Sequence, residues 1–157
     1  MSNPAQRLQE LGLILPTLSA PLAAYIPVQR TGNLLFISGQ LASDQNGIIK
    51  GRLGENIEIE SAQIAAKNAA LSVLSQVVNS AGIELEQISS LIKLSIFVAS
   101  TPDFELHHLV ANGASELMAD VLGDKGKHAR AAFGVAALPL GAVVEIEAII
   151  EIAEIVK

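Results

Sequence analysis

The sequence predicts an α+β domain in which two long helices cover one face of a mixed β-sheet. Two long segments place apolar residues at the three- and four-residue spacing of a helix, and shorter segments rich in Val and Ile have the pattern of strands. With 157 residues, half of them hydrophobic, the chain is long enough for one domain with its own core. The expected order is hairpin, helix, strand, helix, hairpin.

The first third of the chain predicts a short helix and a hairpin. Asn3-Pro4 is a pattern typical of a helix start, and Gly12 is expected to end that helix. After an extended segment punctuated by prolines, residues 25–29 and 34–37 have the pattern of two strands. Thr31-Gly32-Asn33 is the expected turn between them.

The middle of the chain predicts a helix, a strand and a second helix. The first helix is expected from about Glu60 to Ala81, with Gly82 as its stop. Residues 88–98 follow as a strand, and the second helix is expected to begin at Thr101-Pro102-Asp103 and to end near Gly123. In the strand, four apolar residues are expected to share one face: Ile92, Leu94, Ile96 and Val98.

Two strands, 129–137 and 143–153, are expected to close the chain as a hairpin joined by Leu138-Pro139-Leu140-Gly141. In the last strand, every second residue from Val144 to Ile152 is apolar, whereas the opposite face carries carboxylates. The apolar face is expected to meet the helices. The carboxylate face is expected to line water, a cleft or a partner.

Composition excludes several classes of function. The net charge of −6 and the 3% of aromatic residues argue against a large nucleic-acid interface. The absence of cysteine excludes disulfides, thiolate nucleophiles and zinc–thiolate sites. No apolar run reaches the ~20 residues that cross a bilayer, and the first residues lack the pattern of a signal peptide, so a cytoplasmic location is expected. A mean hydropathy of +0.45 predicts a homo-oligomer with an apolar interface.

Arg130 is the strongest candidate functional residue, because it stands in a stretch of small and apolar residues. A guanidinium keeps its charge, so burial there requires an anion. Two interpretations stay open: a clamp for a ligand carboxylate, and a structural arginine paired with Glu145 or Glu147.

His107-His108 is not expected to bind a metal, because adjacent helical residues point about 100° apart. His128, two residues before Arg130, is interpreted as a residue at the start of a strand, with a pH-sensitive role in the site as the alternative.

Several of these residues together resemble the RidA (YjgF) family, also called the L-PSP endoribonuclease family. The resemblance rests on His128-Ala129-Arg130, on Leu138-Pro139, on Val144-Glu145-Ile146-Glu147, and on the first hairpin from Gly32 to Gln40. It covers residues 22–153. We therefore expect a single domain, 1–157, with residues 1–20 as an N-terminal helical extension.

This resemblance implies a chorismate-mutase-like α+β fold that assembles as a homotrimer with sites at the subunit interfaces. Members that carry the arginine hydrolyse reactive imines and enamines, such as 2-aminoacrylate and 2-iminobutanoate, to 2-oxo acids and ammonia, without a metal or an organic cofactor. By position, Arg130 would hold the substrate carboxylate and Glu145 would position or activate water.

The resemblance also implies which residues surround the substrate. Ser38 and Gly39 would line the site, and Tyr25 and Asn112 would complete it from across an interface. Phe133, where relatives usually have Val, is expected to narrow or reshape the pocket beside Arg130.

Two other functions remain in view. A non-catalytic trimer that binds small carboxylates such as 2-oxo acids would share the arginine clamp. The ribonuclease or translation-inhibitor activity suggested by the older family label is less consistent with the negative charge and the few aromatic residues.

Overall fold

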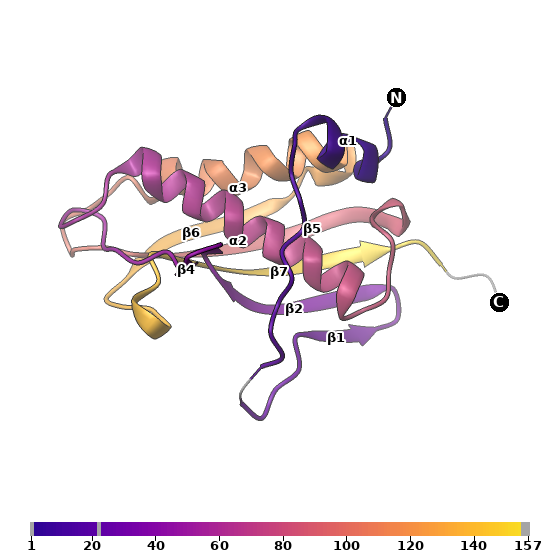
Figure 1. The fold of residues 1–157 in the computed structure, drawn as a ribbon, viewed down its shortest axis with the longest axis horizontal. Coiled ribbons are helices and arrows are strands. Elements are labelled where there is room, and N and C mark those ends of the chain that lie inside the picture. The colour runs from indigo at the N-terminus through magenta and orange to yellow at the C-terminus, as the bar shows by residue number, and fades with distance from the viewer. Residues whose placement is uncertain (1, 22, 155–157) are drawn as a thin grey trace.

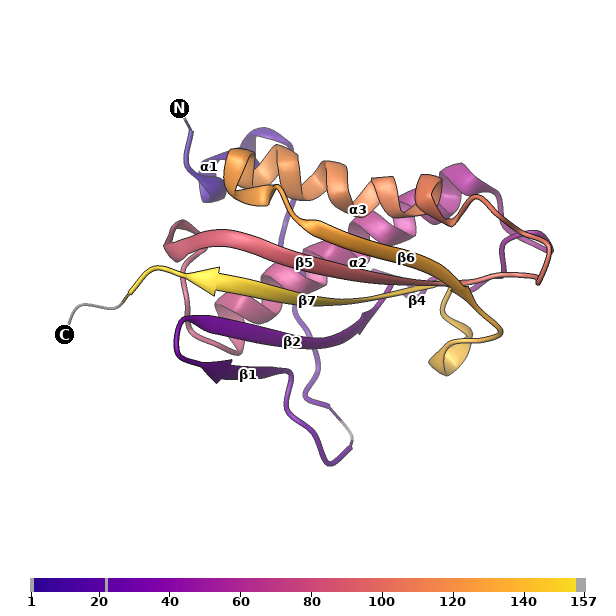
Figure 2. The same cartoon turned by 180° about the vertical axis from the view of Figure 1, so that it is seen from behind.

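A computed structural model describes residues 2–21 and 23–154. Two long helices cover one face of a five-stranded sheet with the strand order β1-β2-β7-β5-β6 (Figure 1). Seen from behind, the other face of the sheet carries no helix (Figure 2). The α+β class and the placement of both long helices on one face are thereby confirmed. In chain order the elements are α1 Pro4–Glu10, β1 Val28–Thr31, β2 Leu34–Leu41, β3 Ser43–Asp44, β4 Gly47–Ile48, α2 Ile59–Asn79, β5 Ile88–Ala99, α3 His107–Leu122, β6 Ala129–Val135 and β7 Val144–Ile152.

The last two strands do not form the expected hairpin. β7 lies between β2 and β5 and is antiparallel to both, whereas β6 pairs in parallel with the other edge of β5. A parallel pair needs a long crossover, and α3 supplies it between β5 and β6. The hairpin prediction was wrong because β5 lies between β6 and β7, so that the short connection joins two strands that are not neighbours in the sheet. As a result, α3 lies over β6.

The core lies between the helices and the sheet. The expected apolar face of β7 is confirmed, since Val144, Ile146, Ala148, Ile150 and Ile152 are all buried. In β5 the alternation holds only from Leu94 onward. The pairing register with β7 shifts between Leu91 and Lys93, so that Ile92 is 38% exposed and does not share the buried face.

Three predicted boundaries differ from the structure by three residues or more. β2 continues to Leu41 rather than ending at Ile37. The first strand begins at Val28 rather than at Tyr25, which lies in the preceding bend. α3 begins at His107 rather than at Thr101, because the backbone N–H of Thr101 donates to Leu53 O at 2.9 Å and holds that segment out of the helix.

The N-terminal helix matches its prediction. Asn3 and Gln6 form a reciprocal capping box at its start, and Gly12 follows its end with a φ of 68°. The chain then passes in front of α2 (Figure 1), where the hydroxyl of Ser75 donates to Pro16 O at 2.5 Å. The N-terminal extension is thus fastened to the long helix.

The two long helices approach closely at Gly113 of α3. A Cβ at this position would overlap Gln63 O and approach Gln63 Cα to 3.0 Å, so a side chain there would meet backbone rather than a movable group. The side chain of Gln63 also donates to Leu109 O at 2.8 Å. This contact determines the distance between α3 and α2, and therefore the position of α3 above β6.

We expect Gly113→Ala to destabilise the protein by about 1–3 kcal/mol, because overpacking against backbone outweighs the better helix propensity of alanine. Chemical unfolding at one fixed protein concentration measures this change. Asp120→Ala, an exposed substitution on the same helix, is the control and should stay within about 0.5 kcal/mol of the parent. A Gly113→Ala variant at least as stable as the parent would contradict the proposed close contact.

Candidate functional site

Arg130 lies on β6, the edge strand beneath α3. Its register partner on β5 is Leu94, which is fully buried under the helices, so Arg130 projects from the helix-covered face of the sheet. The residue itself is exposed in the single chain, because β6 has no neighbouring strand on its outer side. The guanidinium therefore lies at the rim of the α3–β6 layer and not in the core.

Two neutral side chains of α3 hold one end of this guanidinium. Arg130 Nη1 donates to Asn112 Oδ1 at 2.9 Å and to Ser115 Oγ at 3.2 Å. These contacts occupy Nη1 alone. Within the described residues, no hydrogen bond is made by Nε or Nη2, and no carboxylate lies within ion-pair distance of Arg130. The alternative interpretation, a structural pair with Glu145 or Glu147, is therefore not realised in the single chain.

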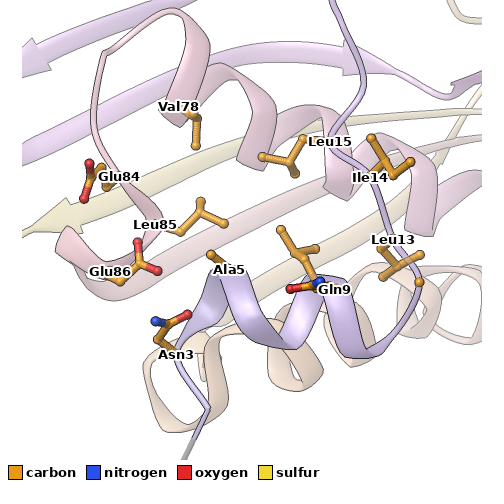
Figure 3. Close-up of a pocket in the computed structure, with 12 residues that line it drawn as sticks. Asn3, Ala5, Gln9, Leu13, Ile14, Leu15, Val78, Glu84, Leu85 and Glu86 are labelled. Carbon is orange, nitrogen blue, oxygen red and sulfur yellow. The ribbon is translucent and has the colours of Figure 1, made fainter.

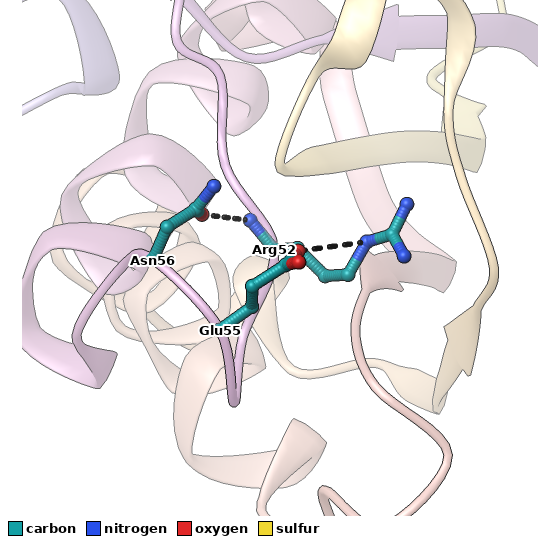
Figure 4. A network of polar contacts seen from close by, with 3 residues as sticks. All are labelled: Arg52, Glu55 and Asn56. Carbon is teal, nitrogen blue, oxygen red and sulfur yellow. Dashed lines mark hydrogen bonds and ion pairs between the residues drawn. The ribbon is translucent and has the colours of Figure 1, made fainter.

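Arg52 provides a contrast within the same chain. Its Nε lies 3.5 Å from Glu55 Oε2, and its backbone N–H donates to Asn56 Oδ1 at 2.8 Å (Figure 4). The guanidinium of Arg52 therefore has a carboxylate three residues away in its own loop, whereas that of Arg130 has only uncharged acceptors.

Ser115 connects Arg130 to a histidine. Ser115 Oγ lies 2.9 Å from His128 Nε2, and His128 Nδ1 lies 2.6 Å from Gly126 O. The sequence favoured His128 as the start of a strand, with a pH-sensitive role in the site as the alternative, and it did not single out Ser115. The available signal was the three-residue spacing of Asn112 and Ser115, which puts both on one face of a helix.

Glu145 lies on the opposite face of the sheet. Its neighbours on β7, Val144 and Ile146, are buried under the helices, so the alternation of the strand turns Glu145 to the face that carries no helix. Burial raises the pKa of the Glu145 carboxyl above its usual value, and the nearby Glu147 carboxylate raises it further.

Gly39 and Ser38 lie beside Glu145. A Cβ on Gly39 would overlap Glu145 Oε1, so the absence of a side chain lets the carboxylate lie against β2 at the register shift between Ile37 and Gln40. The hydroxyl of Ser38 donates to Ile26 O at 2.7 Å, which ties the segment carrying Tyr25 to the same part of β2. Tyr25 is 54% exposed.

Phe133 does not share a face with Arg130. Being three residues further along β6, it projects to the face without helices, where its ring meets Phe97 edge-on at a centroid distance of 5.3 Å. Within one chain, the ring therefore does not narrow the surroundings of Arg130.

The predicted site residues thus form two groups in one chain. Asn112 joins Arg130 at the α3–β6 edge, and it does so within the same chain rather than from across an interface. Ser38 and Gly39 join Glu145 on the other face of the sheet. The single chain does not bring the guanidinium and the carboxylate together.

A second serine–histidine pair lies further along the helix-covered face of β6. Ser100 Oγ lies 3.0 Å from His107 Nε2, and a Cβ on Gly134 would overlap both side chains. Burial lowers the pKa of His107, and the nearby charge of His108 lowers it further. The glycine at position 134 therefore leaves space for this pair.

A cavity of about 930 Å³ lies elsewhere, between α1 and the turn before β5 (Figure 3). Its described lining is mainly apolar, with Leu13, Leu15 and Leu85 beside the carboxylates of Glu84 and Glu86. No Lys, Arg or His is among those lining residues. The cavity is therefore a poor place to hold a carboxylate, and Arg130 is the better candidate despite its open position.

Two further findings concern the described part of the chain. Across residues 2–21 and 23–154, no group of three or more His, Asp or Glu residues is arranged to hold a metal ion. No helix in these ranges combines the length and the apolar character needed to cross a bilayer.

Comparison with known proteins places the chain among relatives. The model of the family described as endoribonuclease L-PSP matches residues 17–152. The protein TCP17 of Trypanosoma cruzi is 42% identical over 150 residues, covering 94% of this chain and 93% of that protein.

Two solved structures are also similar. The protein Atu1372 of Agrobacterium tumefaciens, whose function is unknown, is 47% identical with a TM-score of 0.87, covering 95% of this chain and 93% of its own. RidA from an Antarctic Psychrobacter is 27% identical with a TM-score of 0.54, covering 85% of this chain and 92% of its own.

We expect Glu145→Gln to flatten the dependence of stability on pH. Because the pKa of Glu145 is raised in the folded state, the folded state retains a proton that the unfolded state loses first. Stability should therefore fall as the pH rises from the usual carboxyl range through the raised pKa, and the neutral glutamine should not show this loss.

The measurement is the free energy of unfolding of both proteins between about pH 4 and about pH 7.5, at one protein concentration. Glu116→Gln, an exposed substitution on α3, is the control and should keep the parental slope. Equal slopes for Glu145→Gln and the parent would show that the pKa of Glu145 is the same in the folded and unfolded states, which would contradict the raised pKa.

Proposed function

This chain belongs to the endoribonuclease L-PSP family, and we propose that it hydrolyses reactive 2-imino and enamine acids to 2-oxo acids and ammonia. Family membership supports a RidA-type or endoribonuclease-like role. The observation that carries the finer proposal is the guanidinium of Arg130, which is held at Nη1 and has no carboxylate partner among the described residues. Substrates of the 2-aminoacrylate and 2-iminobutanoate type carry the carboxylate that this group is suited to bind.

Arg130 would bind the substrate carboxylate through its Nε–Nη2 edge. This edge presents parallel N–H groups that match the two oxygens of a carboxylate. Asn112 directs the other end of the guanidinium toward α3, which keeps the binding edge turned outward. Such a clamp orients the C=N bond of the substrate for attack by water. Because the imine is already reactive, orienting it is a large part of what the site must contribute to catalysis.

Glu145 would act as the proton carrier. The enamine first tautomerises to the imine, and water then adds to the C=N carbon. Glu145 accepts a proton from this water and passes it to the imine nitrogen, which gives a carbinolamine with one hydroxyl and one amino group. In a second relay through Glu145 the hydroxyl proton moves to the same nitrogen, the C–N bond breaks, ammonia leaves and the oxygen of water becomes the keto oxygen. Burial raises the pKa of the Glu145 carboxyl, and a carboxylate with a raised pKa is a stronger base than an ordinary glutamate.

The site would be completed by a second copy of the chain. Arg130 and Asn112 lie at the β6 edge, whereas Glu145, Ser38 and Gly39 lie on the other face, toward β2. Contact between the β6 edge of one subunit and the β2 side of the next would bring the two groups together. Repeated head to tail, this contact closes a ring, and we propose the homotrimer. Tyr25 would then line the site from the Glu145 side, and Phe133 would lie at the same subunit contact.

We expect Arg130→Ala to lower kcat/KM for 2-aminoacrylate by about 100-fold, because the truncated side chain leaves the substrate carboxylate without a partner. Arg130→Lys should retain part of the activity, since it keeps the charge but loses the paired N–H groups. A serine dehydratase would generate the substrate in situ, and the measurement is the rate of imine loss in the presence of a trapping amine.

The matched control is Arg52→Ala, which removes an arginine already paired with Glu55. It should retain the parental rate. Carboxylate binding that depends on Arg130, without any turnover, would instead favour the non-catalytic binder of 2-oxo acids. Parental turnover in Arg130→Ala would reject the clamp itself.

We also expect two inactive variants to restore activity when mixed. If each site takes Arg130 from one subunit and Glu145 from its neighbour, random mixing of Arg130→Ala with Glu145→Gln should rebuild about a quarter of the sites. The two proteins would be unfolded together, refolded and assayed, with each variant refolded alone as the control. Complete inactivity of a mixture shown by mass spectrometry to contain mixed oligomers would refute a site shared between subunits.

A further inference from the structure

The hydrogen bonds around His128 have a fixed direction. Gly126 O can only accept, and it lies 2.6 Å from His128 Nδ1, so that nitrogen carries the proton. In the neutral ring, Nε2 is then an acceptor, and the hydroxyl of Ser115 must donate to it across 2.9 Å. The oxygen of Ser115 is thereby left as an acceptor for Arg130 Nη1 at 3.2 Å.

Both ends of this hydrogen-bond network, which runs from Gly126 through His128 to Ser115, contact α3. Gly126 is buried, and a Cβ on it would overlap Met118 O of α3, so its backbone lies directly against that helix. The carbonyl of Gly126 therefore has little freedom to move. From there the bonds pass through His128 and return to α3 at Ser115, near the start of the strand that carries Arg130.

The result is a guanidinium oriented by acceptors that bring no charge. Nη1 has two hydrogens, and Asn112 and Ser115 supply one acceptor for each. With both directed to α3, the plane of the group is fixed and the Nε–Nη2 edge stays turned away from the helix. The nearby cation Lys127 is directed to Asp124, 2.9 Å away, and so is engaged elsewhere.

We infer that His128 and Ser115 are positioning residues that orient Arg130 for side-on binding of a carboxylate. This inference rests on the proposed function for its role in binding, but the orientation itself can be measured without any ligand. An arginine that is already ordered loses less side-chain freedom when the anion arrives. Breaking this hydrogen-bond network should therefore weaken carboxylate binding without removing the positive charge of Arg130.

The first measurement is rotation about the Nε–Cζ bond of Arg130, followed by NMR in protein with ¹⁵N-labelled arginine. The signals of Arg130 are assigned by their absence in Arg130→Lys. We expect slow rotation in the parent and faster rotation in both Ser115→Ala and His128→Leu. His128→Gln should recover much of the restriction, because its amide oxygen can accept from the Ser115 hydroxyl.

The second measurement is the affinity for 2-oxobutanoate, determined by calorimetry on the same proteins. Ser115→Ala and His128→Leu should weaken binding by about 10-fold, with His128→Gln recovering part of the loss. Asp120→Ala, on an exposed part of α3 outside this network, should behave as the parent in both measurements. Should His128→Leu fail to fold, Ser115→Ala tests the same bond from the other side.

The outcomes separate the two proposals. Parental rotation and parental affinity in both Ser115→Ala and His128→Leu would overturn the positioning role and leave the proposed function intact. Faster rotation in these variants, in a protein that binds no 2-oxobutanoate, would support the positioning of Arg130 and count against the proposed function. Faster rotation with unchanged affinity would show that the orientation does not serve binding and would also overturn the inference.

Discussion

The proposed site depends on how the guanidinium of Arg130 is held. Arg130 donates through Nη1 to two uncharged acceptors on α3 and meets no carboxylate among the described residues. Neutral acceptors satisfy hydrogen bonds without cancelling charge, so the attraction for an anion is preserved. This arrangement requires α3 to lie directly above β6, which follows from the crossover that α3 makes between the parallel strands β5 and β6.

The second constraint is the two-residue period of a strand. It turns Val144 and Ile146 into the core and therefore turns Glu145 to the other face, away from the guanidinium. The two groups cannot neutralise each other within one chain. Glu145 is therefore not paired with this cation. It is half-buried against Gly39, and this burial raises the pKa of its carboxyl.

The features that could be predicted from the sequence are those that depend on the spacing of residues within a single helix or strand. The long helices, the apolar face of β7 and the capped first helix all follow from spacing within one element. The pairing of β6 with β5 could not be predicted in this way, because a short connection between β6 and β7 resembles a hairpin. The bonds from Arg130 through Ser115 to His128 were also missed, since they join a helix face to the residues before a strand. By contrast, the resemblance singled out Asn112, and the structure places it 2.9 Å from Arg130.

The separation of the two groups also bears on the form of the proposed assembly. A two-fold dimer brings the same surface of both subunits together, so it would place Arg130 edge against Arg130 edge and oppose like charges. A head-to-tail contact instead places the β6 edge against the β2 side, where Glu145 lies, so that opposite charges meet. Because every subunit carries both surfaces, such a contact repeats from one subunit to the next, and it forms a closed ring when the rotation between subunits returns to the first one. In a closed ring, the Arg130 group of every subunit meets the Glu145 group of its neighbour. The same contact would cover much of the sheet face that carries no helix in the single chain (Figure 2).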